Sequence, residues 1–205
     1  GQFTEEGIYD GTGKITFSND ETWYGEFKNG VPYNGKGILY FYPGKFIKGV
    51  KNGDGEYYFP KGDKYIGEFK NGLSHGQGSF TWVNGDKYVG NHENGKSNGQ
   101  GTFMWVSGES AGDTYIGEFK DGRGHGYGTY TWSSGEFAGD KYVGQWMDGN
   151  KHGDGTYRDP HGNQYSGQWK NGLPNGLGIH SHKDGKVEEG MFEKGKFLYA
   201  KLISP

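Results

Sequence analysis

The sequence predicts an all-β fold, an elongated and twisted single-layer antiparallel sheet built from about eight stacked β-hairpins. Three observations support this prediction. Glycine pairs of the form G-x-G recur along almost the whole chain. Apolar and polar residues alternate with a period of two, which is typical of strands. Aromatic residues make up 17% of a chain that is only 30% hydrophobic, so rings must supply the burial that aliphatic side chains supply in most proteins.

The G-x-G pairs mark a repeating unit. The commonest spacing between pairs is 23 residues, and two spacings of 27 result from four-residue insertions around Ala111 and Ala138. A period of this size is typical of repeat architectures, in which each unit packs on its neighbours. The pairs are Gly11/Gly13, Gly35/Gly37, Gly53/Gly55, Gly76/Gly78, Gly99/Gly101, Gly126/Gly128, Gly153/Gly155 and Gly176/Gly178.

Each unit is predicted to form one hairpin. A first run reads Y-x-G-x-aromatic, as in Tyr65–Phe69, and a turn such as Lys-Asn-Gly follows it. The G-x-G pair then leads into a second alternating run, as in Ser79–Trp82. Two alternating runs joined by an Asn-Gly or Asp-Gly connection predict a β-hairpin. We expect connections longer than two residues, which leaves the turn type open, and x-G-D turns between successive hairpins.

Glycines inside the strands need a packing reason, because glycine otherwise weakens a sheet. Alternation places Gly67 and Gly78 on the same face as the bulky rings. A bare α-carbon leaves room for a neighbouring ring to lie flat across the strand. We therefore expect rings to pack over glycines throughout the array.

The repeat array is predicted to span residues 1–195, with residues 196–205 as a C-terminal cap or tail. The end of the chain, KGKFLYAKLISP from Lys194 onward, departs from the repeat, and the tail is expected to be a short helix or a folded-back strand. Repeat arrays need caps at their ends. Unpaired strand edges at the end hairpins would also allow a homodimer.

Charge and composition exclude several classes of protein. The formal net charge is −3, so nothing indicates a nucleic-acid partner. The absence of cysteine excludes disulfides and thiolate metal sites. The sequence contains no run of 18 apolar residues, the length that would indicate a membrane span.

Candidate catalytic groups are few. His75, His125 and His152 occupy the same slot in H-G-x-G, which favours a hairpin position over an oxyanion loop, since no G-x-S-x-G motif accompanies them. His180 and His182 share a face, but no third ligand for a metal is evident. We therefore predict no catalytic residues, no metal and no cofactor.

Aspartates after glycine form a second repeated slot. They recur in G-D-[KT]-Y, and a row of carboxylates can indicate calcium, but the glycine-rich calcium repeats have a different period. We expect these side chains to accept hydrogen bonds from turn amides instead. The residues are Asp63, Asp86, Asp113 and Asp140.

The string Y-x-G-x-[FW]-x-x-G-x-x-x-G-x-G-x-[YF] resembles the MORN repeat (membrane occupation and recognition nexus). Residues 65–80, 115–130, 142–157 and 165–179 match most of its slots. His92 and Glu188 are departures, because they replace an aromatic residue and the tyrosine, respectively. The resemblance implies a non-enzymatic scaffold that holds a segment of another protein, in the cytoplasm and with membrane or cytoskeletal association.

A single-layer sheet leaves some of its rings exposed in a groove, and exposed apolar surface tends to mark interaction sites. We therefore predict that an aromatic groove binds a peptide or helix of a partner protein. The predicted partner-binding residues are Tyr40, Trp82, Trp105, Trp132, Tyr157, Tyr65, Tyr88, Tyr115, Tyr142 and Tyr165.

An alternative is a peripheral membrane module that binds anionic phospholipid headgroups such as phosphoinositides. The family resemblance suggests it, together with lysines in matching slots. These are Lys28, Lys70, Lys120 and Lys170. The net charge of −3 argues against strong attraction to an anionic surface.

Overall fold

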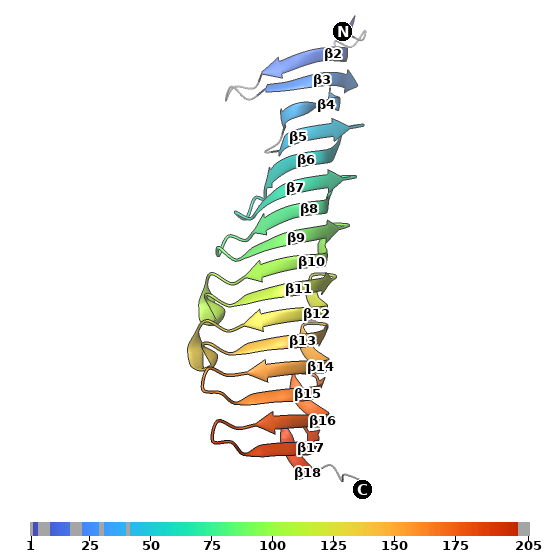
Figure 1. The fold of residues 1–205 in the computed structure, drawn as a ribbon. Helices are drawn as coiled ribbons and strands as arrows, with labels where there is room; N and C mark the ends of the chain where they lie inside the picture. The colour runs from blue at the N-terminus through green and yellow to red at the C-terminus, as the bar shows by residue number, and fades with distance from the viewer. Residues whose placement is uncertain (1, 4–8, 17–21, 29–30, 40–41, 201–205) are drawn as a thin grey trace. The chain divides into compact units, whose positions relative to one another are not determined.

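A computed structural model describes residues 2–3, 9–16, 22–28, 31–39 and 42–200. The chain divides into two compact units. The first unit comprises residues 1–83 and 89–96, and the second comprises residues 84–88 and 97–205. Figure 1 shows strands following one another along the chain within each unit.

The first unit is an antiparallel sheet in which each strand from β2 to β8 pairs with the next along the chain. β1 pairs with β2. The strands are β1 (Gln2–Phe3), β2 (Tyr9–Thr16), β3 (Thr22–Lys28), β4 (Val31–Leu39), β5 (Tyr42–Ile47), β6 (Val50–Tyr58), β7 (Lys64–Lys70) and β8 (Leu73–Thr81). β9 (Lys87–Glu93) has residues in both units.

The second unit continues the same pattern, with sequential antiparallel pairing from β10 to β18. Its strands are β10 (Lys96–Met104), β11 (Thr114–Lys120), β12 (Arg123–Thr131), β13 (Lys141–Met147), β14 (Asn150–Arg158), β15 (Gln164–Lys170), β16 (Leu173–Ser181), β17 (Val187–Glu193) and β18 (Lys196–Ala200). The two insertions form the 3-10 turns η1 (Gly108–Ser110) and η2 (Gly135–Phe137). These findings confirm the predicted all-β, hairpin-by-hairpin fold.

The hairpin turns differ from the prediction. Lys70 pairs with Leu73, so the loop between β7 and β8 has two residues, not more. Both loop residues have positive φ, 53° at Asn71 and 82° at Gly72. This is the type I′ geometry, which matches the twist of paired strands and favours Asn-Gly and Asp-Gly. The Asn-Gly and Asp-Gly signal therefore specified the turn type directly.

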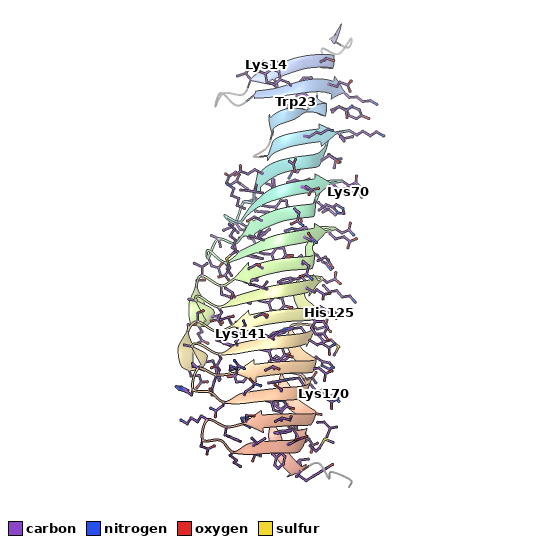
Figure 2. The ribbon with its side chains drawn as sticks, viewed as in Figure 1. Lys14, Trp23, Lys70, His125, Lys141 and Lys170 are labelled. Atoms are coloured by element: carbon purple, nitrogen blue, oxygen red, sulfur yellow. The ribbon has the colours of Figure 1, made fainter. Side chains whose placement is uncertain are left out.

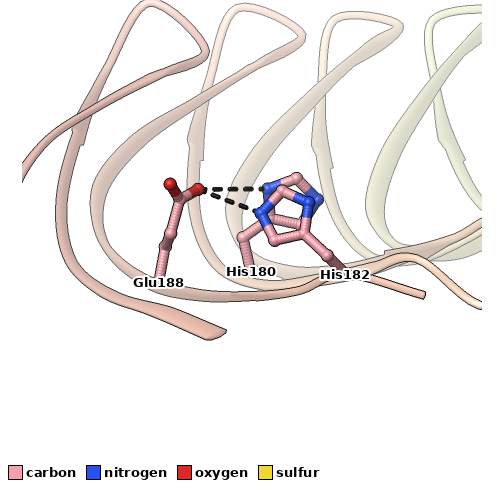
Figure 3. A group of neighbouring side chains, drawn as sticks. All are labelled: His180, His182 and Glu188. Carbon is pink, nitrogen blue, oxygen red and sulfur yellow. Dashed lines mark hydrogen bonds and ion pairs between the residues drawn. The ribbon is translucent and has the colours of Figure 1, made fainter. Parts of the chain in front are cut away.

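A bulge bends each hairpin just beyond its turn. In β7–β8 the register runs from Gly67↔Gly78 to Phe69↔Ser74, so Glu68 faces three residues of β8. A bulge of this kind bends the strand that carries it. Figure 3 shows the curled ribbons that result in the second unit. The rings of the repeat lie on the inside of this curl.

The glycine pairs lie beneath tyrosine rings, as the sequence predicts. Gly144 pairs with Gly155, and the Tyr142 ring lies across this pair. A β-carbon on Gly155 would lie 2.5 Å from Cζ of Tyr142, closer than side chains tolerate. The same contact recurs between Tyr65 and Gly78, and between Tyr165 and Gly178. The bare α-carbons therefore create the space in which the rings pack.

Aspartates of the G-D-[KT]-Y slot link successive repeats. Oδ1 of Asp63 accepts a hydrogen bond from the backbone N–H of Val83 at 2.9 Å, and Oδ1 of Asp86 accepts one from Val106 at 2.8 Å. Asp113 accepts one from Ser133 at 2.7 Å. Each bond joins residues 20 apart, so the turn that ends one repeat is hydrogen-bonded to the turn that ends the next repeat. The expected role in binding turn amides is confirmed for these three. Asp140 instead accepts a hydrogen bond from the Tyr157 hydroxyl, because the equivalent position 160 is proline and has no N–H to donate.

Gly155→Ala is expected to destabilise the second unit by about 3 kcal/mol, because a β-carbon overlaps the Tyr142 ring and the core must shift. Gly149→Ala, in the turn of the same hairpin, serves as the control. A β-carbon there meets nothing within 4 Å, and only the positive φ of 81° opposes alanine. It is expected to cost about 1 kcal/mol. Equal losses of unfolding free energy in urea titrations would contradict the ring-over-glycine account.

Candidate functional site

Buried rings form what we call the inner aromatic row. In the second unit it is a continuous series of edge-to-face contacts with centroid separations of 4.8–5.2 Å. Edge-to-face pairs at this spacing are the favoured aromatic geometry. In order, the rings are Tyr88, Phe119, Tyr115, Trp146, Tyr142, Trp169, Tyr165 and Phe192. In the first unit Tyr65 contacts Phe69 at 5.0 Å and His92 at 4.9 Å.

The tyrosine hydroxyls satisfy the backbone groups that the bulges expose. The Tyr142 hydroxyl donates to the carbonyl of Gln145 at 3.0 Å, and Tyr115 donates to Glu118 at 3.0 Å. The side chain of Gln145 accepts from the N–H of Asp154 at 2.9 Å. Burial of these hydroxyls raises their pKa values, to about 12 for Tyr165. Side chains of the same repeat therefore hydrogen-bond the backbone groups at the bulge.

A second series of rings, the outer aromatic row, comes from the ends of the second strands and lies half-buried. Trp105 contacts Tyr130 at 5.2 Å, and Tyr130 contacts Trp132 at 4.4 Å. Its members are Tyr57, Phe59, Phe80 and Trp82 in the first unit, and Phe103, Trp105, Tyr130, Trp132 and Tyr157 in the second. Because the sheet is a single layer in each unit, no second layer covers these rings within the described residues.

A cavity of about 340 Å³ opens in the second unit between the two rows. Trp132, Tyr157, Trp169 and Phe192 line it with apolar surface. Lys151 of β14 projects among these rings, with Nζ 4.6 Å from the centroid of Trp169. Its Nζ also lies 5.1 Å from the ring of Tyr157. Burial lowers the pKa of Lys151 to about 8.

The first unit has a smaller counterpart. Its cavity of about 180 Å³ is lined by Lys51, Tyr57 and Phe59, among others. Lys51 occupies the slot of Lys151, and its Nζ lies 3.1 Å from the centroid of Tyr57. Burial lowers the pKa of Lys51 as well. The described residues of each unit therefore include an aromatic pocket around a lysine.

The sequence-predicted partner residues divide into two groups. Trp82, Trp105, Trp132 and Tyr157 lie in the outer row and are partly accessible. The five tyrosines of the Y-x-G motif are buried, at 4% exposure or less, and belong to the inner row. They are Tyr65, Tyr88, Tyr115, Tyr142 and Tyr165. Their burial leaves these five rings little surface for direct contact with a partner, so their role in binding stays a prediction. Tyr40 lies outside the described residues.

Sequence reasoning missed Lys151, Tyr130 and Trp169. Tyr130 and Trp169 stand in regular aromatic slots, so aligning every slot of the repeat would have found them. Lys151 follows a turn, and its slot holds Ser74, Gly124 and Pro174 in other units. Only the curl of the hairpin shows that this slot points among rings.

The four lysines of the lipid alternative are exposed at the C-terminal ends of β3, β7, β11 and β15. Lys28 and Lys70 belong to the first unit, and Lys120 and Lys170 to the second. Figure 2 labels Lys70 and Lys170 at the turn edge of their units. Acidic residues occupy the equivalent or adjoining positions Glu93, Asp121, Asp148 and Glu193.

The repeated histidines lie at the bulges, as expected for a hairpin position. The carbonyl oxygens of His75 and His125 face the hydroxyls of Tyr65 and Tyr115 at 3.4 and 3.5 Å. His180 and His182, in contrast, meet a third polar side chain that sequence reasoning did not find. Glu188 of β17 lies beside both (Figure 3).

The chain belongs to the MORN repeat family. The family model matches residues 42–64, 65–87, 88–110, 115–137, 142–164 and 165–187. Comparison with curated protein sequences finds no match. Among solved structures, the chain is similar to the SAS-4 (dCPAP) TCP domain of Drosophila melanogaster, solved in complex with a proline-rich motif of Ana2 (dSTIL). That similarity has a TM-score of 0.42 at 10% identity and covers 88% of this chain and 90% of the other.

No helix among the described residues is both long and apolar enough to cross a membrane.

The stability of the second unit is expected to rise with pH above about 8. The pKa of Lys151 is about 8 in the folded state and about 10.4 when unfolded. The unfolded chain therefore binds more protons between these values, and the free energy of unfolding increases across that window. From pH 7 to 9.5 the Lys151 contribution is on the order of 2 kcal/mol.

Urea titrations at both pH values would measure this effect. Lys151→Met should remove the Lys151 contribution to the increase and raise the free energy of unfolding at pH 7. Lys141→Met, at an exposed lysine, should change neither the pH dependence nor the stability at pH 7. Identical pH dependence in the Lys151→Met variant and the wild type would contradict a buried, charged lysine at this position.

Proposed function

We propose that this chain is a non-enzymatic scaffold that holds a segment of another protein along the outer aromatic row of the second unit. One observation supports the proposal most strongly. The half-exposed rings of Trp105, Tyr130 and Trp132 lead along the sheet to the cavity beside Lys151. This arrangement offers a continuous apolar surface with one charged group near its end.

The apolar surface fits a protein segment. Partly exposed Trp and Tyr side chains are enriched where proteins bind one another, because they bury a large area with little loss of rotamer freedom. A cavity of about 340 Å³ holds a few side chains rather than a folded element. An extended segment that inserts one or two side chains is therefore the best fit.

The charge of the pocket indicates the chemistry of that segment. Among the described residues, no carboxylate lies within 4 Å of Lys151 Nζ. Burial lowers the pKa of Lys151 despite the attraction of Asp140, so this ammonium gains from a further carboxylate brought in by a ligand. We therefore infer a partner segment that carries Asp or Glu flanked by apolar side chains.

A binding role also agrees with how the buried acids are used. Asp113 accepts hydrogen bonds from the Tyr130 hydroxyl and the Ser133 amide, each at 2.7 Å. Asp140 accepts one from the Tyr157 hydroxyl. These carboxylates hold the repeat together, so we assign them a structural role and propose no catalytic one.

Selection of a random peptide display library on the full chain would test the proposal. Selected peptides are expected to share a carboxylate among apolar residues. Trp132→Ala should weaken their binding at least tenfold in fluorescence anisotropy, about 1.4 kcal/mol. Lys151→Met should remove the preference for Glu over Gln in the peptide. Val143→Ala, on the opposite face of β13, is the matched control.

Circular dichroism should show unchanged strand content in all variants. Peptides that bind Trp132→Ala as tightly as the wild type would contradict the groove, and a selection without binders would do the same.

Lipid binding is the second candidate function. The four exposed lysines at strand ends favour it, because each can reach an anionic surface, where one lysine contributes about 1 kcal/mol. The acidic residues at neighbouring turns lower the local positive charge, so we rank this function below protein binding. We also propose a cytoplasmic location with membrane or cytoskeletal association, and a homodimer formed through end hairpins.

Sedimentation with phosphatidylcholine vesicles, with and without phosphoinositide, would test lipid binding at low salt. If the lysines bind headgroups, the chain should pellet only with phosphoinositide, and Lys120→Glu combined with Lys170→Glu should reduce pelleting several-fold. Recovery of the wild type in the supernatant with both vesicle types would rule this function out.

A further inference from the structure

Three metal-ligating side chains meet where β16 pairs with β17. His180 lies directly opposite Glu188 in the register, and His182 lies two residues further along the same face. Oε2 of Glu188 is 3.1 Å from Nε2 of His182 and 3.8 Å from Nδ1 of His180. Figure 3 shows both imidazoles turned towards the same carboxylate oxygen. One ligand atom from each residue lies within 4.8 Å of the other two.

The internal repeat shows that these three residues depart from the pattern together. The slot of His180 holds Tyr130 and Tyr157 in the two preceding hairpins, and the slot of Glu188 holds Tyr142 and Tyr165. The slot of His182 holds Trp105 and Trp132 in earlier hairpins and Asp159 in the preceding one. Three adjoining positions that are otherwise mostly aromatic therefore become His, His and Glu at one place in the chain. Loss of packing alone does not account for this choice of side chains.

We propose that His180, His182 and Glu188 bind a divalent transition metal of the Zn²⁺ class. Zinc takes imidazole nitrogen and carboxylate oxygen at about 2.0–2.2 Å. Two such ligands on a tetrahedral ion lie about 3.3–3.5 Å apart. The distances of 3.1 and 3.8 Å bracket this value, so small side-chain rotations bring the ligands into place. Three protein ligands leave one coordination position for water or another group.

Lys186 positions the carboxylate for this role. Its Nζ lies 2.6 Å from Oε1 of Glu188, the oxygen that faces away from the histidines. Oε2 is therefore presented to the two imidazoles, and Glu188 would bind the metal through one oxygen. Partners that orient a ligand in this way typically change metal affinity by about 10–100-fold when removed. His180 also lines the cavity beside Lys151, and the test of metal binding uses no partner peptide.

Isothermal titration of the chelator-treated full chain with ZnCl₂ tests the site. One equivalent is expected to bind. His180→Tyr, His182→Trp and Glu188→Tyr place the side chains of the other repeats in these slots, so each variant should fold while losing at least tenfold in affinity. His125→Ala removes a histidine outside the cluster and should bind as the wild type does.

Two further measurements separate a metal site from an ion pair between Glu188 and the histidines. Co²⁺ should give the visible absorption of a four-coordinate ion in the wild type and not in His182→Trp. Lys186→Ala should weaken Zn²⁺ binding about tenfold, whereas the exposed Lys183→Ala should not. The proposal is overturned if the wild type takes up no stoichiometric Zn²⁺, or if the three slot variants retain wild-type affinity.

Discussion

The tyrosine ring that lies over a pair of facing glycines is the contact on which the rest of this structure depends. Gly144 and Gly155 bring two backbones together without side chains between them, and Tyr142 fills the space above. Its hydroxyl then donates to the carbonyl of Gln145, which the bulge would otherwise leave unpaired. One side chain thus supplies burial and satisfies a buried polar group. This combination allows a sheet with few aliphatic residues to hold together.

The groove follows from the same contact. The bulge beside each glycine pair bends the hairpin, and the inner rings fill the inside of the bend. The outer rings, such as Trp132, lie further along the second strand, where the single layer has nothing with which to cover them. Exposure of the outer row is therefore a consequence of the architecture. The partner proposed for it takes the place that a second layer occupies in other β proteins.

Regular slots let the chain change its chemistry without changing its fold. Nearest-neighbour packing holds each hairpin, so a substitution in one slot alters a single place in the array. Lys151 adds a buried charge to an apolar pocket in this way. His180, His182 and Glu188 add ligand atoms where other hairpins have rings. Lys151 and the His180, His182 and Glu188 cluster thus stand where the repeat is broken, whereas the rings proposed to bind a partner occupy its regular slots.

The sequence by itself determined the hairpin repeat, the ring-over-glycine packing and the aspartate links, because each depends on contacts within one repeat or between neighbouring repeats. It also indicated Trp82, Trp105, Trp132 and Tyr157 as accessible rings, although it could not separate them from the buried tyrosines. Only the tertiary structure decided that separation, since the bulge sets which ring faces inward. It likewise brought Glu188 to His180 and placed Lys151 among rings, because strand register and hairpin curl are not visible in a linear pattern.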